Sequence, residues 1–177
     1  MLAYRDGDGA AFEVLYARWR GPLYRYFLRQ CGHAGQADEL FQDVFMRVIG
    51  AAAGYEPTAK FTTWLFRIAH NRLIDHWRKT GREPVEPLAS GEDGDDCAPD
   101  PPAPEDAAPD RQAEQRELRE ALVAALNELP EVQREAFLLA EEGGLTLEEI
   151  ASLSGVGRET VKSRLRYATA RLRHKLE

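Results

Sequence analysis

Cysteine and histidine are scarce in this sequence, and their spacing excludes the sites that depend on them. The 177 residues include two cysteines, Cys31 and Cys97, and neither has a partner at CxxC spacing. The four histidines are scattered along the chain. Because a disulfide framework or a zinc site needs such residues in clusters, we expect neither of them here.

Long apolar runs are absent as well. No stretch approaches the roughly 18 apolar residues that a helical membrane span requires. The first residues, from Met1 to Asp6, lack the apolar core of a secretory signal peptide. We therefore expect no membrane insertion, and we expect the protein to stay in the cytoplasm.

Positive charge is in deficit overall, but the deficit comes from one segment. Residues 81–110 hold ten Asp or Glu against the single Arg82, a net charge of −9, so the other residues carry +2 of the total −7. The same segment has seven of the ten prolines and few large apolar residues, so it cannot bury enough surface to fold. We predict a flexible acidic linker over 81–110 that separates two domains, 1–80 and 111–177.

Signals for β-structure are missing from both halves. Neither half shows strand alternation or a hairpin turn, and apolar residues recur at helical spacing instead. The predicted helices cover about 12–27, 37–49, 63–79, 111–129, 131–142 and a final pair from Leu145 onward. Gly21-Pro22 predicts a kink or a break in the first helix. The predicted fold class is all-α, with two small helical domains and a four-helix C-terminal domain.

The final pair of helices has the pattern of a helix-turn-helix. Thr146 and Glu149 fit a capping box, in which each side chain satisfies a free amide of the first helical turn. Gly155 supplies the positive φ of a sharp turn between helices. Val161 and Leu165 then begin an apolar stripe that gives the second helix a buried side.

The opposite side of this second helix is rich in cations. Between Arg158 and Lys175 there are seven Lys or Arg and one acidic residue, a local reversal of the overall charge. Such side chains pair with phosphates and with guanine edges, while a glutamate accepts from cytosine. The pattern therefore predicts a helix that reads duplex DNA in the major groove, with these candidate contacts: Arg158, Glu159, Lys162, Ser163, Arg166 and Tyr167.

The helix predicted over 63–79 carries a second polar face. Arg67, Asn71, Asp75 and Arg78 fall together on one side, and Arg72 and Lys79 flank them. Tyr55, Phe61 and Trp64 lie in or beside the preceding loop, where aromatic rings suit the stacking of an unpaired base, although core packing also claims some of them. On spacing alone, a merely solvated helix surface remains an equal alternative.

The helix predicted over 37–49 has the opposite character. It presents Asp38, Glu39, Gln42 and Asp43 among its apolar residues. Because acidic groups repel phosphate, this surface suits a protein partner.

Three segments occur in a fixed order along the chain: DELFQDVFMRV, FTTWLFRIAHNRLIDHWRK and LNELPEVQREAFLLAEEGGLTLEEIASLSGVGRETVKSRL. Together they resemble the extracytoplasmic-function group of bacterial RNA polymerase sigma factors. The resemblance covers nearly the whole chain except the linker. It implies region 2 in residues 1–80, region 4 in residues 111–177, and a non-catalytic initiation subunit that needs no cofactor. It also implies three partners: core RNA polymerase, promoter DNA and an anti-sigma factor.

The resemblance assigns roles by position. It implies that Asp38, Glu39, Gln42 and Asp43 dock on the clamp helices of the polymerase largest subunit, and that region 4 meets the β flap. The candidate contacts of the helix-turn-helix named above correspond in position to residues of the helix that reads the minus-35 element. The set implied for minus-10 recognition and melting is Tyr55, Lys60, Phe61, Trp64, Arg67, Asn71, Arg72, Asp75, Arg78 and Lys79.

Two other functions remain as alternatives. A polymerase-independent helix-turn-helix regulator would bind palindromic DNA as a dimer. An enzyme acting on nucleic acid would need clustered carboxylates or a nucleophile with its base, and the densest acidic residues lie in the linker. We therefore expect no catalytic residues.

Overall fold

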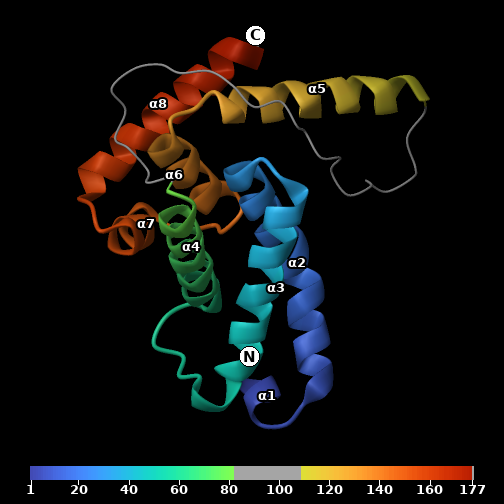
Figure 1. Ribbon diagram of the computed structural model, residues 1–177, viewed down its shortest axis with the longest axis vertical. Helices are drawn as coiled ribbons and strands as arrows, with labels where there is room; N and C mark the ends of the chain where they lie inside the picture. Colours follow the sequence, from blue (N-terminus) through green and yellow to red (C-terminus); the bar gives the residue numbers. More distant parts are fainter. Residues whose placement is uncertain (82–108, 177) are drawn as a thin grey trace.

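The computed structural model describes the backbone of residues 1–81 and 109–176, and the side chains of 1–81 and 116–176. All regular elements within these residues are helices (Figure 1), as predicted. In chain order they are α1 (Leu2–Arg5), α2 (Gly9–Cys31), α3 (Ala34–Gly50), the 3-10 turn η1 (Ala52–Gly54), α4 (Phe61–Thr80), α5 (Pro109–Asn127), α6 (Glu131–Glu141), α7 (Leu147–Ser154) and α8 (Arg158–Leu176). The predicted linker lies mostly outside the described residues.

The N-terminal half is built on three long helices, α2, α3 and α4. Asp8 caps the start of α2 by accepting a hydrogen bond from the Ala11 amide, and Gly32 ends the helix in a left-handed conformation at φ 72°. Of the two outcomes predicted at Gly21-Pro22, the break does not occur, because α2 continues through Pro22. Buried residues on both sides of the proline, Leu15 and Leu23, pack into one core and hold the two parts of the helix together.

The short elements α1 and η1 were not predicted, because they are too short to show a helical period. The buried side of α4 is wide. Phe66 and Trp77 are fully buried, and His76 is half-buried. The packing of α4 against both α3 and the C-terminal half explains this wider buried face.

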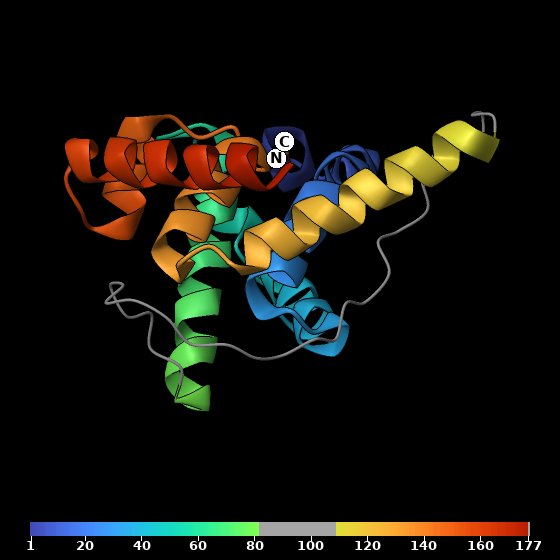
Figure 2. The ribbon, with the colours of Figure 1, turned by 90° about the horizontal axis from the view of Figure 1, so that it is seen from above.

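The C-terminal half confirms the predicted helix-turn-helix. Thr146 and Glu149 form both hydrogen bonds of the capping box at the start of α7. Gly155 ends α7 at φ 69°, and α8 then begins at Arg158. A small separate core of α5 and α8 residues, including Leu126 and Leu172, packs these two helices together. In Figure 2, the first part of α5 projects beyond the rest of the molecule.

The two halves share one apolar core, which the sequence did not predict. Phe66 of α4 belongs to the same buried cluster as Leu138 and Leu139 of α6 and Ile150 of α7. A Cβ atom on Gly143 would come within 3.2 Å of the Phe66 ring, so a glycine there permits the close approach. The halves therefore pack on one another rather than standing apart.

Within residues 1–81 and 109–176, no helix combines the length and the hydropathy that a membrane crossing requires.

Candidate nucleic-acid interface

The predicted minus-35 face of α8 is open to solvent. Arg158, Glu159, Lys162, Arg166 and Tyr167 are exposed, and Ser163 is half-buried. The opposite side of the helix is anchored in the core by three buried residues: Val161, Ala168 and Leu172. The burial of that side fixes the rotation of α8 and turns the polar face outward, as the spacing predicted.

Acidic neighbours orient the first cation of this face. Arg158 Nε lies 2.5 Å from Glu148 Oε1 on α7, and its Nη1 lies 3.4 Å from Glu159. Glu159 also lies 3.6 Å from Lys162 Nζ. A hydrogen bond from its own backbone amide, and then one from Arg158, lower the pKa of Glu148, while the hydrogen bond to Glu148 raises that of Arg158. Arg158 is therefore held across the turn between α7 and α8 by its pair with Glu148.

Arg166 and Tyr167 form a pair farther along α8. Arg166 Nη2 donates a hydrogen bond of 3.2 Å to the Tyr167 hydroxyl, and the guanidinium carbon lies 5.0 Å from the ring centroid. Tyr167 is 52% exposed. The ring stacks beside the guanidinium and restricts its rotamers, which favours a defined contact with a base edge.

The polar face of α4 is mostly exposed. Arg67, Asn71, Arg78 and Lys79 are open to solvent, and Asp75 is half-buried. This arrangement agrees with the predicted spacing and exposes two arginines, a lysine and an asparagine along the helix, with the Asp75 carboxylate among them.

Arg72 differs from the other α4 residues, because it contacts α3. Its side chain is 14% exposed, pairs with Asp43 and lies 3.6 Å from Asp75. Two carboxylates neutralise this guanidinium, so in this arrangement it joins α3 to α4 rather than presenting charge to nucleic acid. Asp43, a predicted docking residue, is correspondingly engaged within the chain.

The loop before α4 is supported by an aromatic cluster. Tyr55 is only 6% exposed and meets Trp64 edge to face at 5.0 Å between ring centroids. Its carbonyl accepts a hydrogen bond of 3.2 Å from Arg5 Nη1. Tyr55 therefore supports the loop from inside, whereas Phe61 and Trp64, the other two aromatic residues predicted here, are half-buried.

The acidic side of α3 includes apolar residues that the sequence interpretation missed. Asp38, Glu39 and Gln42 are exposed, and the same helix exposes Met46 (66%) and Ile49 (39%). Both lie on a different side of the helix from the buried Leu40, Val44 and Val48. Their spacing along the sequence could therefore have predicted their exposure. An acidic surface with exposed apolar side chains suits a protein partner.

Metal chemistry has no candidate site in the part of the chain that the structure describes. No group of three or more His, Cys, Asp or Glu is placed there to hold an ion. Cys31 is buried, and Cys97 falls outside the described residues.

Comparison with known families places the two halves separately. Residues 15–83 match the family model described as Sigma-70 region 2, and residues 119–172 match the model described as Sigma-70, region 4. Among curated proteins, the RNA polymerase sigma factor CarQ of Myxococcus xanthus is 33% identical over 176 residues, covering 99% of this chain and 95% of CarQ. The ECF RNA polymerase sigma factor RpoE of Cereibacter sphaeroides is 35% identical over 98% of this chain and 91% of its own length.

Solved structures agree with these matches. The sigma factor RpoE in complex with the anti-sigma factor NepR, from Bartonella quintana, superposes with a TM-score of 0.66 at 26% identity. That superposition covers 94% of this chain and 96% of RpoE. CnrH, solved in complex with the cytosolic domain of CnrY, has the same fold, with a TM-score of 0.63 at 23% identity over 97% of this chain and 91% of CnrH.

Proposed function

Because this chain belongs to the extracytoplasmic-function (ECF) sigma factors of bacterial RNA polymerase, we propose that its two halves divide promoter recognition between them. A sigma factor binds core RNA polymerase and directs it to promoters. Residues 1–80 would dock on the polymerase and capture melted minus-10 DNA. Residues 111–177 would read the minus-35 duplex.

One observation carries this division of roles. Exposed polar faces with several cations occur on α8 and on α4, in different halves, and only the α4 face adjoins a loop with half-exposed aromatic rings. A basic helix following a helix-turn-helix fits the major groove of duplex DNA. Aromatic rings beside a cationic helix fit an unpaired base. The two faces thus suit two different states of DNA.

Docking on the polymerase is assigned to α3. We propose that Asp38, Glu39 and Gln42, together with Met46 and Ile49, contact the clamp helices of the polymerase largest subunit. Exposed carboxylates supply charge complementarity, and the two apolar side chains supply area that becomes buried. The β flap is the proposed partner of the C-terminal half.

Strand opening then needs no chemistry from this chain. Binding energy for unpaired bases shifts the duplex toward its melted state, so we propose a non-catalytic subunit without a cofactor. The RpoE structure from Bartonella quintana holds an anti-sigma factor, and we propose a partner of that kind here.

Run-off transcription tests the proposal. Purified core polymerase is supplied with a promoter library, with and without this protein, and transcripts are sequenced. We expect transcripts that start at a defined subset of promoters only when the protein is present. A footprint on a palindrome by the protein alone, with no promoter-dependent transcript, would support the polymerase-independent regulator instead.

A further inference from the structure

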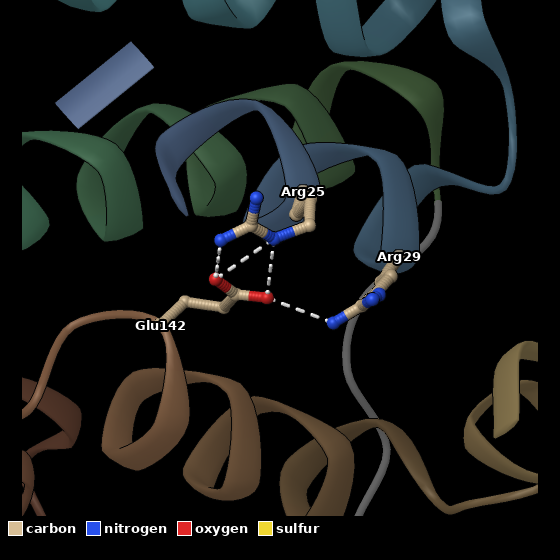
Figure 3. A network of polar contacts seen from close by, with 3 residues as sticks. All are labelled: Arg25, Arg29 and Glu142. Atoms are coloured by element: carbon tan, nitrogen blue, oxygen red, sulfur yellow. Dashed lines mark hydrogen bonds and ion pairs between the residues drawn. The ribbon is translucent and has the colours of Figure 1, made fainter. Parts of the chain in front are cut away.

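Three carboxylates of the C-terminal half contact the N-terminal half at three places. We call the interface between the two halves the seam. The first is at the end of α6, where Glu142 sits between two arginines of α2 (Figure 3). Arg25 donates to both carboxylate oxygens, with Nη2 at 2.8 Å and Nε at 3.0 and 3.1 Å, and Arg29 Nη1 donates at 2.8 Å. The Glu142 side chain is only 8% exposed. Charge-assisted pairs of this geometry are strong where water is excluded.

The second place lies deeper in the seam. Glu135 of α6 approaches His70 of α4, with 2.5 Å between Oε1 and Nδ1, and both side chains are buried. The Tyr26 hydroxyl of α2 is also near Glu135 but makes no hydrogen bond of good geometry. Burial, and then the charge of Glu135, raise the pKa of Tyr26 well above its ordinary value. Polar groups that are buried and incompletely paired weaken the seam.

The third place is the start of α4, inside the proposed minus-10 surface. Glu149 Oε1 accepts a hydrogen bond of 2.8 Å from the Thr63 hydroxyl and lies 3.6 Å from Lys60 Nζ. The first turn of α4 has no acidic residue, and Lys60, its N-cap, makes no side-chain cap. Glu149 therefore brings negative charge to an uncapped, positive helix end beside a lysine and a hydroxyl, which is the setting that binds phosphate.

We propose that this packing is a self-inhibited state, in which Glu149 occupies the place of a single-stranded DNA phosphate at Lys60 and Thr63 until the halves separate. The inference rests on the proposed function, because it assigns the start of α4 to melted DNA. Glu142 links the two halves through Arg25 and Arg29, and Glu149 blocks the site. The exposed face of α8 is unaffected, so the closed state blocks strand capture and leaves duplex reading possible.

The contact between the halves is weak enough in net free energy to be reversible. Buried ion pairs stabilise a contact weakly in net terms, because each charge loses its hydration. Once the halves separate, water, phosphate or a protein surface can replace the glutamates as partners of Arg25, Arg29 and Lys60. A ligand that binds only the separated form therefore shifts the population toward it.

The closed state is tested first by distance. Spin labels are placed on cysteines at the exposed positions Arg18 of α2 and Arg173 of α8, with Cys97→Ser and the buried Cys31 retained. Double electron–electron resonance should give a single distance population for the parent chain. Glu142→Lys should produce a second, longer population, and Glu141→Lys, an exposed neighbour with the same charge change, should not.

A charge exchange separates opening from misfolding. Arg25→Glu with Arg29→Glu, added to Glu142→Lys, should restore the single distance population of the parent. An unchanged distribution in Glu142→Lys, or a failure of the exchange to restore it in a helical, monomeric protein, overturns the closed-state proposal.

The blocking role of Glu149 is tested with a fluorescein-labelled pool of random single-stranded 12-mers and no polymerase. Glu149→Gln keeps the capping box, because glutamine serves at that position. It should bind the pool about tenfold more tightly than the parent. Glu141→Gln removes the same charge from an exposed position of α6, away from Lys60, Thr63 and the α8 face, and it should bind like the parent.

Core polymerase provides the last comparison. If polymerase holds the halves apart, the advantage of Glu149→Gln disappears in its presence, whereas a purely local charge effect would persist and overturn the blocking role. Run-off transcription by the same variants keeps the two proposals distinct. Normal promoter-dependent transcription by the parent, together with a Glu149→Gln variant that binds the single-stranded pool no more tightly than the parent, would refute self-inhibition alone. Absent transcription by the parent would refute the sigma function.

Discussion

At the scale of single residues, one side chain serves two elements that are distant in sequence. Glu149 caps its own helix through the Thr146 amide and also accepts from Thr63 across the seam. The backbone hydrogen bond at Thr146, and next the Thr63 hydroxyl, lower its pKa. Its charge therefore links the stability of α7 to the contact between the halves.

This lowered pKa predicts a dependence on acid. A carboxyl whose pKa is lower in the folded state stabilises that state above its unfolded pKa, and the contribution is lost as pH falls through the folded value. At pH 7, Glu149→Gln should reduce the free energy of unfolding by about 1 kcal/mol. The difference from the parent should shrink below about pH 5. Urea titrations across pH measure it, and a difference that stays constant down to about pH 3.5 would contradict this account.

Arg166 carries a second prediction at this scale. Tyr167 holds its guanidinium on the exposed face of α8, so Arg166→Ala should cost about 1 to 3 kcal/mol at minus-35 sequences that it reads. Run-off yields from promoters that differ at single minus-35 positions measure this cost. A uniform loss over all of these promoters would mean that Arg166 contacts only phosphate.

At the scale of elements, the turn between α7 and α8 sets the direction of the recognition helix. Gly155 stands at φ 69°, whereas Gly157 has no such conformation and its carbonyl accepts the first bonds of α8. An added Cβ at Gly157 would meet only Thr160 Oγ1, at 3.9 Å. The backbone conformation therefore favours glycine at position 155, whereas position 157 has room for a side chain.

The same substitution should have opposite effects at these two positions. Gly155→Ser places a side chain in the left-handed region and should lower the free energy of unfolding by about 1 to 2 kcal/mol. Gly157→Ser provides a hydroxyl at the N-cap and should raise it by a few tenths of a kcal/mol. Thermal unfolding followed by circular dichroism compares them, and equal effects would refute the assigned conformations.

At the scale of the whole molecule, the shared core couples the stability of the halves. All three tryptophans, Trp19, Trp64 and Trp77, lie in the N-terminal half, so their fluorescence follows the unfolding of that half. Leu139 belongs to the core shared with α4, whereas Leu126 belongs to the separate α5–α8 core. Both leucines are fully buried in the C-terminal half.

Leu139→Ala should therefore destabilise what tryptophan fluorescence observes. Loss of its buried side chain costs about 2 to 5 kcal/mol, and part of that loss should appear as a lower urea midpoint of the fluorescence transition. Leu126→Ala should lower the urea midpoint of the helical circular-dichroism signal by a similar amount but shift the fluorescence midpoint less. Identical fluorescence midpoints for both variants would mean that the shared core does not couple the halves.

The sequence predicted the local features of the fold and the site. Helical periodicity, the Thr146–Glu149 box and Gly155 determine structure through nearby residues, so the helix-turn-helix and the exposed α8 face were predicted correctly. The continuous path of α2 through Pro22, the burial of Tyr55 and the pairing of Arg72 with Asp43 depend on contacts between distant segments. Periodicity along one helix carries no information about such contacts.

The contrast between the two DNA faces has a consequence for the order of events at a promoter. The recognition face of α8 is exposed in the closed molecule, while the start of α4 is paired with Glu149. Under the proposed roles, a free chain would engage the upstream duplex before it holds any unpaired base. Promoter search and promoter melting would then be successive steps, with the separation of the halves as the event between them.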